Sequence, residues 1–173
     1  MLRSFWTSRS SASIFLVKMK LLSDASEYAL RATVWLSQRP GETHKLREIA
    51  EGTKATPGYL IKVLQSLARA GIFSTQRGSN GGFSLLRDPK TLTALEVINA
   101  VDPIQRIRTC PLGIESHGTC LCPMHRRIDD AMASIEQSFG DTTIAELIEE
   151  NAQSRPLCDA LMAPPATAEK PNA

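Results

Sequence analysis

The sequence predicts a mainly α-helical protein with a small β-hairpin wing, built as a winged helix-turn-helix followed by a long dimerisation helix. Three observations carry this prediction. Two helical patterns are separated by about four residues, two β-prone runs around a glycine-rich turn follow them, and a later helical stretch carries apolar residues at spacings of 4, 3 and 4. The 173 residues suit one domain with appendages, and no apolar run of about 18 residues predicts a membrane helix.

Charge divides the chain into unequal parts behind a net charge of only +2. Residues 1–18 carry +3, residues 19–90 carry +5, residues 91–150 carry −6 and residues 151–173 are neutral. A basic first half predicts contact with a polyanion, and the acidic half predicts another task. We expect residues 1–18 to be a non-native or disordered extension before a start at Met19, although a transit or signal peptide reads similarly. The Pro- and Ala-rich tail is expected to be disordered.

The basic half opens with two helices. Ser23 can cap the first, which should run to about Ser37 before Pro40-Gly41 ends it. The second should span about 45–51, where Gly52 is expected to stop it.

A third helix and a hairpin follow. Thr56 can offer its hydroxyl as a cap and Pro57 suits the first helical position, with Gly71 closing the helix. The runs 72–76 and 83–86 flank the glycine-rich turn and predict the hairpin.

This arrangement predicts DNA binding by the outer face of the third helix and by the wing. Arg77 would suit a phosphate or the minor groove, and the wing glycines would permit positive φ or close backbone approach. Helix-turn-helix patterns also occur in proteins that never touch DNA, and the glycines alone predict only a loop or a weak phosphate cradle. The candidate DNA-binding residues are Thr56, Gly58, Tyr59, Lys62, Ser66, Arg77, Gly78, Ser79 and Asn80.

The acidic half should contain three helices. Thr93 and Glu96 form a capping box that starts a helix at Ala94, which should end near residue 102. A long helix should follow His125 and end near Phe139, with a seam for a partner helix at Ile128, Met132, Ile135 and Phe139. A second capping box, at Thr143 and Glu146, should start a short last helix.

Between the first two of these helices, a loop gathers metal-ligating side chains. Its spacing is Cys-x9-Cys-x-Cys-x2-His, formed by Cys110, Cys120, Cys122 and His125, with His117 inside it. Zinc in a closed Cys₃His site, an iron–sulfur cluster, or a thiol redox switch would each use such a set. No arrangement of nucleophile, base and oxyanion site is recognisable, so we expect a protein that is not an enzyme.

With these motifs in place, the chain resembles the Rrf2 family of winged-helix regulators, which includes IscR-like and NsrR-like iron–sulfur sensors. The similarity covers about residues 19–150. MKLLSDASEYALRATVWL is similar to the family's first helix, and LTALEVINAVD to the helix after the wing. The family's helix-turn-helix and wing are matched by IAEGTKATPGYLIKVLQSLARAGIFSTQRGSNGGFSL. The segment CPLGIESHGTCLCPMHRRIDDAM falls where the family places its cluster loop and the start of its long dimerisation helix.

The resemblance implies specific ligands. Cys110 and Cys122 match the family's first and last cysteines, and His125 matches a histidine ligand of IscR-like members. The middle ligand departs from the family, since only one residue separates Cys120 from Cys122, and His117 is the alternative. Some members take a carboxylate from the partner's first helix, where this chain has Glu27; Cys158 matches no ligand.

The resemblance also implies a cytoplasmic homodimer that binds a palindromic operator in double-stranded DNA. A 2Fe–2S or 4Fe–4S cluster would tune operator affinity in response to redox state, nitric oxide or iron supply. The alternative cofactor is zinc, in a repressor that holds no iron–sulfur cluster. A thiol-switch repressor without metal is the other alternative.

Overall fold

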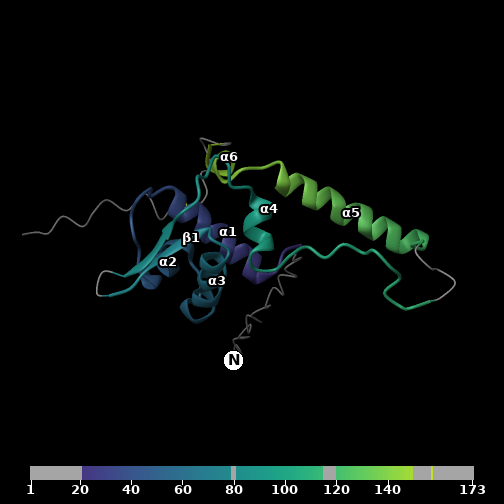
Figure 1. Cartoon of the computed structure of the whole chain (residues 1–173), viewed down its shortest axis with the longest axis horizontal. Coiled ribbons are helices and arrows are strands. Elements are labelled where there is room, and N and C mark those ends of the chain that lie inside the picture. The colour runs from purple at the N-terminus through teal and green to yellow at the C-terminus, as the bar shows by residue number, and fades with distance from the viewer. Residues whose placement is uncertain (1–20, 79–80, 115–119, 150–156, 158–173) are drawn as a thin grey trace, which may run out of the picture.

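The computed structural model describes residues 21–78, 81–114, 120–149 and 157. Helices and strands follow in the order α1 (Asp24–Ser37), α2 (Leu46–Thr53), α3 (Pro57–Arg69), β1 (Phe73–Gln76), β2 (Gly82–Leu85), α4 (Ala94–Asn99), α5 (Pro123–Gly140) and α6 (Ile144–Glu149). Figure 1 shows a body of short elements and a long helix, α5, that extends away from it. The mainly helical fold with one hairpin confirms the predicted fold class.

The body is a winged helix around an apolar core. Helices α1, α2 and α3 pack together through side chains that are almost fully buried, among them Leu36, Ile49, Leu60 and Leu64. Strands β1 and β2 pair antiparallel with Phe73 opposite Leu85. Burying such side chains supplies most of the favourable free energy of folding, so this core holds α3 and the wing together as one unit.

The base of the wing is tied to the loop before α2. His44 and Phe83 exchange two backbone hydrogen bonds, with N···O distances of 2.9 and 2.8 Å. A Cβ on Gly82 would lie 2.2 Å from the backbone oxygen of His44, so only glycine lets the two chains approach this closely.

Gly52 does not end the second helix as predicted. It lies inside α2, where a Cβ would stand 2.0 Å from the indole nitrogen of Trp35. The helix ends instead at Lys54, which takes the left-handed conformation with φ of 53°. Gly52 is therefore a packing position for Trp35, and a polar residue serves as the left-handed terminator.

Helices α4 and α6 belong to the body although they lie in the acidic half. Both predicted capping boxes are present, with Glu96 accepting from the amide of Thr93 and Glu146 from that of Thr143. Thr93 and Thr143 form an isolated β-bridge. Leu92, Val97 and Ile144 are fully buried in the same core as α1, α2 and α3, so α4 and α6 pack as part of the body.

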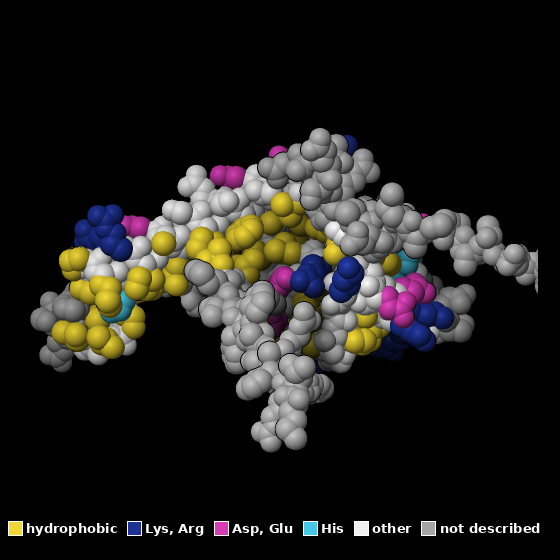
Figure 2. All heavy atoms as spheres, turned by 180° about the vertical axis from the view of Figure 1, so that it is seen from behind, with side chains coloured by type: hydrophobic (Ala, Val, Ile, Leu, Met, Phe, Trp, Pro, Cys, Tyr) yellow, Lys and Arg dark blue, Asp and Glu magenta, His cyan; other side chains and the backbone are white. Residues whose placement is uncertain are grey.

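Residues 103–140 leave the body as an extended loop and α5, which together we call the arm. His125 is the only buried residue that α5 contains. The helix begins at Pro123, so His125 lies in its first turn rather than before it. Of the seam, Ile128 is 41% exposed and Met132, Ile135 and Phe139 are half-buried. Figure 2 shows hydrophobic side chains gathered on this face, over α5 and the neighbouring body.

Several expectations fall on residues outside the described ranges. These are the extension 1–18, the wing residues Ser79 and Asn80, the loop residue His117, and the tail from 151 apart from Leu157. Leu157 packs against the body core. Among the described residues, no helix is long and apolar enough to cross a membrane.

Candidate DNA-binding surface and metal site

Helix α3 presents one face to the core and the other outward. Leu60, Val63, Leu64 and Leu67 line the inner face, as predicted. Gly58, Tyr59 and Lys62 are exposed on the outer face. Tyr59 is 43% exposed, and its ring makes an edge-to-face contact with Tyr28 of α1, with centroids 5.6 Å apart. This contact orients an exposed aromatic residue at the start of the helix.

Thr56 caps α3 by position but not through its hydroxyl. Its side chain makes no cap hydrogen bond, whereas its backbone oxygen accepts from the amides of Tyr59 and Leu60. Pro57 occupies the first turn as predicted, so one amide needs no partner. The Thr56 hydroxyl is therefore exposed and available to an external acceptor such as a phosphate.

The wing adds positive charge beside α3. Arg77 is exposed at the end of β1, and Gly78 has φ of 105°, which begins the turn. A groove of about 440 Å³ runs between α3 and the wing, lined by Gln65, Ala68, Arg69, Thr75, Arg77 and Phe83. Arg69 donates to the hydroxyl of Ser66 at 3.0 Å, which holds the guanidinium along α3. Arg69 and Gln65 were not among the predicted DNA-binding residues, although both lie within one helical turn of Ser66.

At the far end of the arm, a thiol and an imidazole face each other. Cys122 is the residue before α5, and His125 occupies the first turn, so the three-residue spacing brings them to one side of the helix. The distance from Cys122 Sγ to His125 Nδ1 is 3.3 Å, and His125 is only 8% exposed. These are two adjacent donors of the kind that bind zinc or an iron–sulfur cluster.

The other candidate ligands lie apart from this pair. Cys110 is half-buried and Cys120 is exposed, and neither is in a disulfide. Glu27 lies on α1, where it pairs with Arg31. Among the described residues, no group of three His, Cys, Asp or Glu side chains is close enough to hold a metal ion. Of the candidate ligands that the structure describes, Cys122 and His125 are the pair in contact, and His117 lies outside the described residues.

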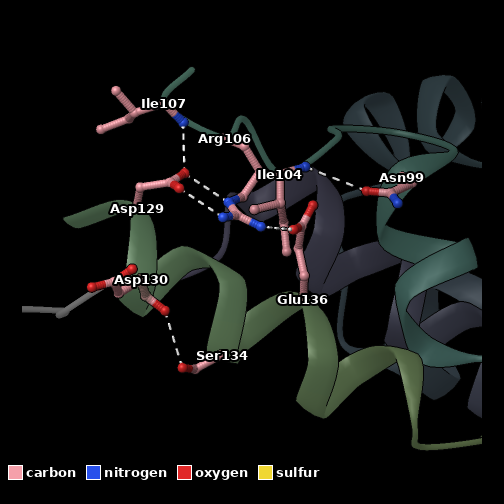
Figure 3. Close-up of polar contacts among 8 residues, drawn as sticks. All are labelled: Asn99, Ile104, Arg106, Ile107, Asp129, Asp130, Ser134 and Glu136. Atoms are coloured by element: carbon pink, nitrogen blue, oxygen red, sulfur yellow. Dashed lines mark hydrogen bonds and ion pairs between the residues drawn. The ribbon is translucent and has the colours of Figure 1, made fainter. Parts of the chain in front are cut away.

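A cluster of charged side chains connects the loop to α5, and the sequence analysis did not identify it. Arg106 forms two parallel hydrogen bonds to Asp129, of 2.7 and 2.6 Å, and one of 3.0 Å to Glu136 (Figure 3). The amide of Ile107 also donates to Asp129, at 2.9 Å. Arg106, as the largest influence, lowers the pKa of Asp129 to about 2, and Ile107 and Arg108 add to the effect. Asp129 and Glu136 are seven residues apart, which predicts one helix face.

A family model described as "Rrf2: Iron-dependent Transcriptional regulator" matches residues 22–150. The chain belongs to the Rrf2 family. The resemblance noted in the sequence is therefore confirmed, and with it the assignment to DNA-binding transcriptional regulators.

Solved structures of Rrf2-like regulators show the same fold. CymR of B. subtilis, titled the global cysteine regulator, is 22% identical with a TM-score of 0.62, over 77% of this chain and 99% of that one. T. potens IscR is also 22% identical, with a TM-score of 0.63, over 76% and 88%. A putative transcriptional regulator from Listeria innocua is 25% identical, with a TM-score of 0.61, over 77% and 89%.

Proposed function

We propose that this Rrf2 protein is a dimeric, cytoplasmic DNA-binding regulator whose operator affinity is controlled by an iron–sulfur cluster of the 2Fe–2S or 4Fe–4S type. The approach of Cys122 to His125 is the observation that carries the proposal. Two donors already in contact need little reorganisation to bind a metal. The family model's description as iron-dependent favours iron over zinc.

The donor set fits such a group. Cys122 and His125 would provide two ligands from the start of α5, and Cys110 a third from the loop. Cys120 or His117 would complete the set within one chain, and Glu27 would do so from a partner subunit. When bound, the cluster supplies a centre whose redox state, or reaction with nitric oxide, changes which arrangement of the loop is favoured.

A second copy of the chain is the proposed partner of α5. Helix α5 has a single buried residue and packs against the body through only part of its length, so the half-exposed seam at Ile128, Met132, Ile135 and Phe139 is left for a second helix to cover. A symmetric pair of arms would place two α3 helices on half-sites about 34–36 Å apart, which requires a palindromic operator.

The DNA contacts follow from this placement. Tyr59 and Lys62 would meet base edges in the major groove, with Gly58 permitting close approach. Thr56, Ser66 and Arg77 would position the protein on phosphates, and Gly78, Ser79 and Asn80 would form the wing tip. Arg69 joins this set because it lines the same groove as Arg77.

A zinc-stabilised or thiol-switch repressor is the second candidate. The same contact favours a zinc site, since a thiol and an imidazole side by side are two of the four donors of a Cys₃His site. Cys120, which is exposed and in no disulfide, would be open to oxidation in a thiol switch.

The deciding experiment is purification under strict anoxia with iron, sulfide and zinc analysis and a visible spectrum. We expect iron and labile sulfide in the wild type, loss of both in Cys122→Ser, and retention in the matched control Cys158→Ser. Zinc without sulfide would establish the zinc alternative, and metal-free protein that responds only to reductant would establish the thiol switch.

A further inference from the structure

The arm is held together by an ionic clamp rather than by an apolar core. Arg106 lies near the start of the loop, and Asp129 and Glu136 lie two turns apart on α5. Figure 3 shows the guanidinium between the two carboxylates, with Ile104 and Ile107 of the loop beside it. Because Arg106 bonds both acids and the Ile107 amide bonds one, this stretch of loop is fixed along α5 by four hydrogen bonds.

The side chains of the clamp are less exposed than the arginines around them. The side chains of Arg106, Asp129 and Glu136 are 21%, 14% and 28% exposed. Arg108, Arg126 and Arg127 are exposed. A partly buried, bidentate arginine–carboxylate pair is shorter and stronger than an ordinary surface ion pair, and its planar fork admits one orientation. Arg106 therefore specifies a geometry, which a flexible lysine would not.

Its position relates the two segments that carry the candidate ligands. Cys110 follows Arg106 by four residues on the loop, and Asp129 follows His125 by four residues, which is one turn of α5. A shift of the loop along α5 would move Cys110 relative to Cys122 and His125, and would have to break the clamp.

We propose that Arg106 is a positioning residue that sets the register of the loop along α5, and with it the place that Cys110 can take relative to the Cys122–His125 pair when a cluster binds, and that it transmits the accompanying movement of the loop to α5. The inference deepens the proposed function and rests on it for the identity of the metal. The clamp itself involves no metal ligand, so it can be tested in metal-free protein. A partly buried pair that joins a ligand-bearing loop to a long helix is suited to a two-state element.

The first test uses metal-free protein and hydrogen exchange at the Ile107 amide. We expect exchange to be about tenfold faster or more in Arg106→Gln and Asp129→Asn, because the hydrogen bond at Ile107 depends on a fixed Asp129. Arg127→Gln removes the same charge from the exposed side of α5 and should leave the rate unchanged. Arg106→Lys, which keeps the charge and folds most readily, should resemble Arg106→Gln. Unchanged rates in Arg106→Lys and Asp129→Asn would overturn the clamp.

The second test compares operator affinity with and without the reconstituted cluster. In the wild type we expect a ratio of about 5–150-fold, and in Arg106→Lys a ratio near one although iron and sulfide are retained. If Arg106→Lys shows fast exchange at Ile107 and yet keeps the wild-type ratio of operator affinities with and without the cluster, Arg106 does not transmit the movement of the loop to α5. Absence of iron and sulfide from the wild type would end the iron–sulfur function and the transmission step together, while the exchange data would still decide the clamp.

Discussion

The body and the arm are stabilised by different forces. In the body, α1, α2, α3, α4 and α6 share one core whose largest side chains are fully buried. In the arm, one histidine is buried on α5 and the loop is attached through Arg106. Apolar burial is non-directional and strong in sum, whereas an ion pair is directional and responds to its surroundings. The shape of the body is thus fixed by many buried contacts, whereas that of the arm depends on a few directional hydrogen bonds.

The largest expected difference between body and arm is in the cost of truncating an apolar side chain. Leu64→Ala in the body should lower the free energy of unfolding by about 2–5 kcal/mol, because its side chain is fully buried. Met124→Ala on the arm, at a residue that is 59% exposed and lies outside the seam, should change it by less than about 0.5 kcal/mol. Urea unfolding followed by circular dichroism measures both. Equal losses would contradict the division between body and arm.

The next effect tests how tightly the wing is joined to the body. Gly82→Ala should destabilise the protein by about 1–3 kcal/mol, because its Cβ would collide with the His44 backbone and break the pairing with Phe83. Gly58→Ala on α3 is the matched control, since its Cβ would meet nothing within 4 Å. Thermal unfolding compares the two variants. If Gly82→Ala is as stable as the wild type, the backbone at His44 can move to accommodate the added methyl group.

Operator binding should depend on the body's charges rather than the arm's. Arg77→Ala should weaken binding to all sequences and reduce the salt slope by about one, as expected for a phosphate contact. Tyr59→Phe and Lys62→Ala should change preference among operators, by about 1–3 kcal/mol for a base contact. Fluorescence anisotropy over several operators and salt concentrations measures this, with Arg127→Ala on the arm as control. If the Tyr59 and Lys62 variants lose the same affinity for every operator, these residues contact the DNA phosphates and not the bases.

The smallest effect sharpens the electrostatic character of the arm. The folded pKa of Asp129 is lowered from its ordinary 3.8 to about 2, so the clamp's contribution is complete above pH 3.8 and is lost as pH falls toward 2. We therefore expect the clamp to be unchanged between pH 7 and 5 and to loosen only below about pH 4. The carboxyl carbon shift of Asp129 in an NMR titration reports this. A midpoint near 3.8 would mean that Arg106 does not hold the carboxylate.

Sequence reasoning performed best where local chemistry decides structure. The capping boxes at Thr93 and Thr143 and the cap at Ser23 located three helix starts, because their hydrogen bonds join residues three apart. The pair Cys122 and His125 was also predictable, since their spacing fits one helical turn.

Sequence reasoning failed where a partner distant in the chain decides. Gly52 looked like a helix stop, and only Trp35 packed against it explains its place inside α2. Thr56 looked like a hydroxyl cap, yet its side chain is left free of that bond. Arg106 lies 23 and 30 residues from its acceptors, and only the spacing of Asp129 and Glu136 hinted at a shared face.

The β-bridge between Thr93 and Thr143 has a consequence for how such regulators diversify. The amide of Ala94 donates to Thr142 and that of Ile144 to Leu92, so the chain returns beside the point where α4 begins. The part of this segment that lies outside the core is the arm, residues 103–140, whose two ends both return to the body, so its length can change without altering the residues of the core. In the proposed dimer, adding whole helical turns to α5 would change the distance between the two α3 helices, and so the half-site spacing of the operator that fits them.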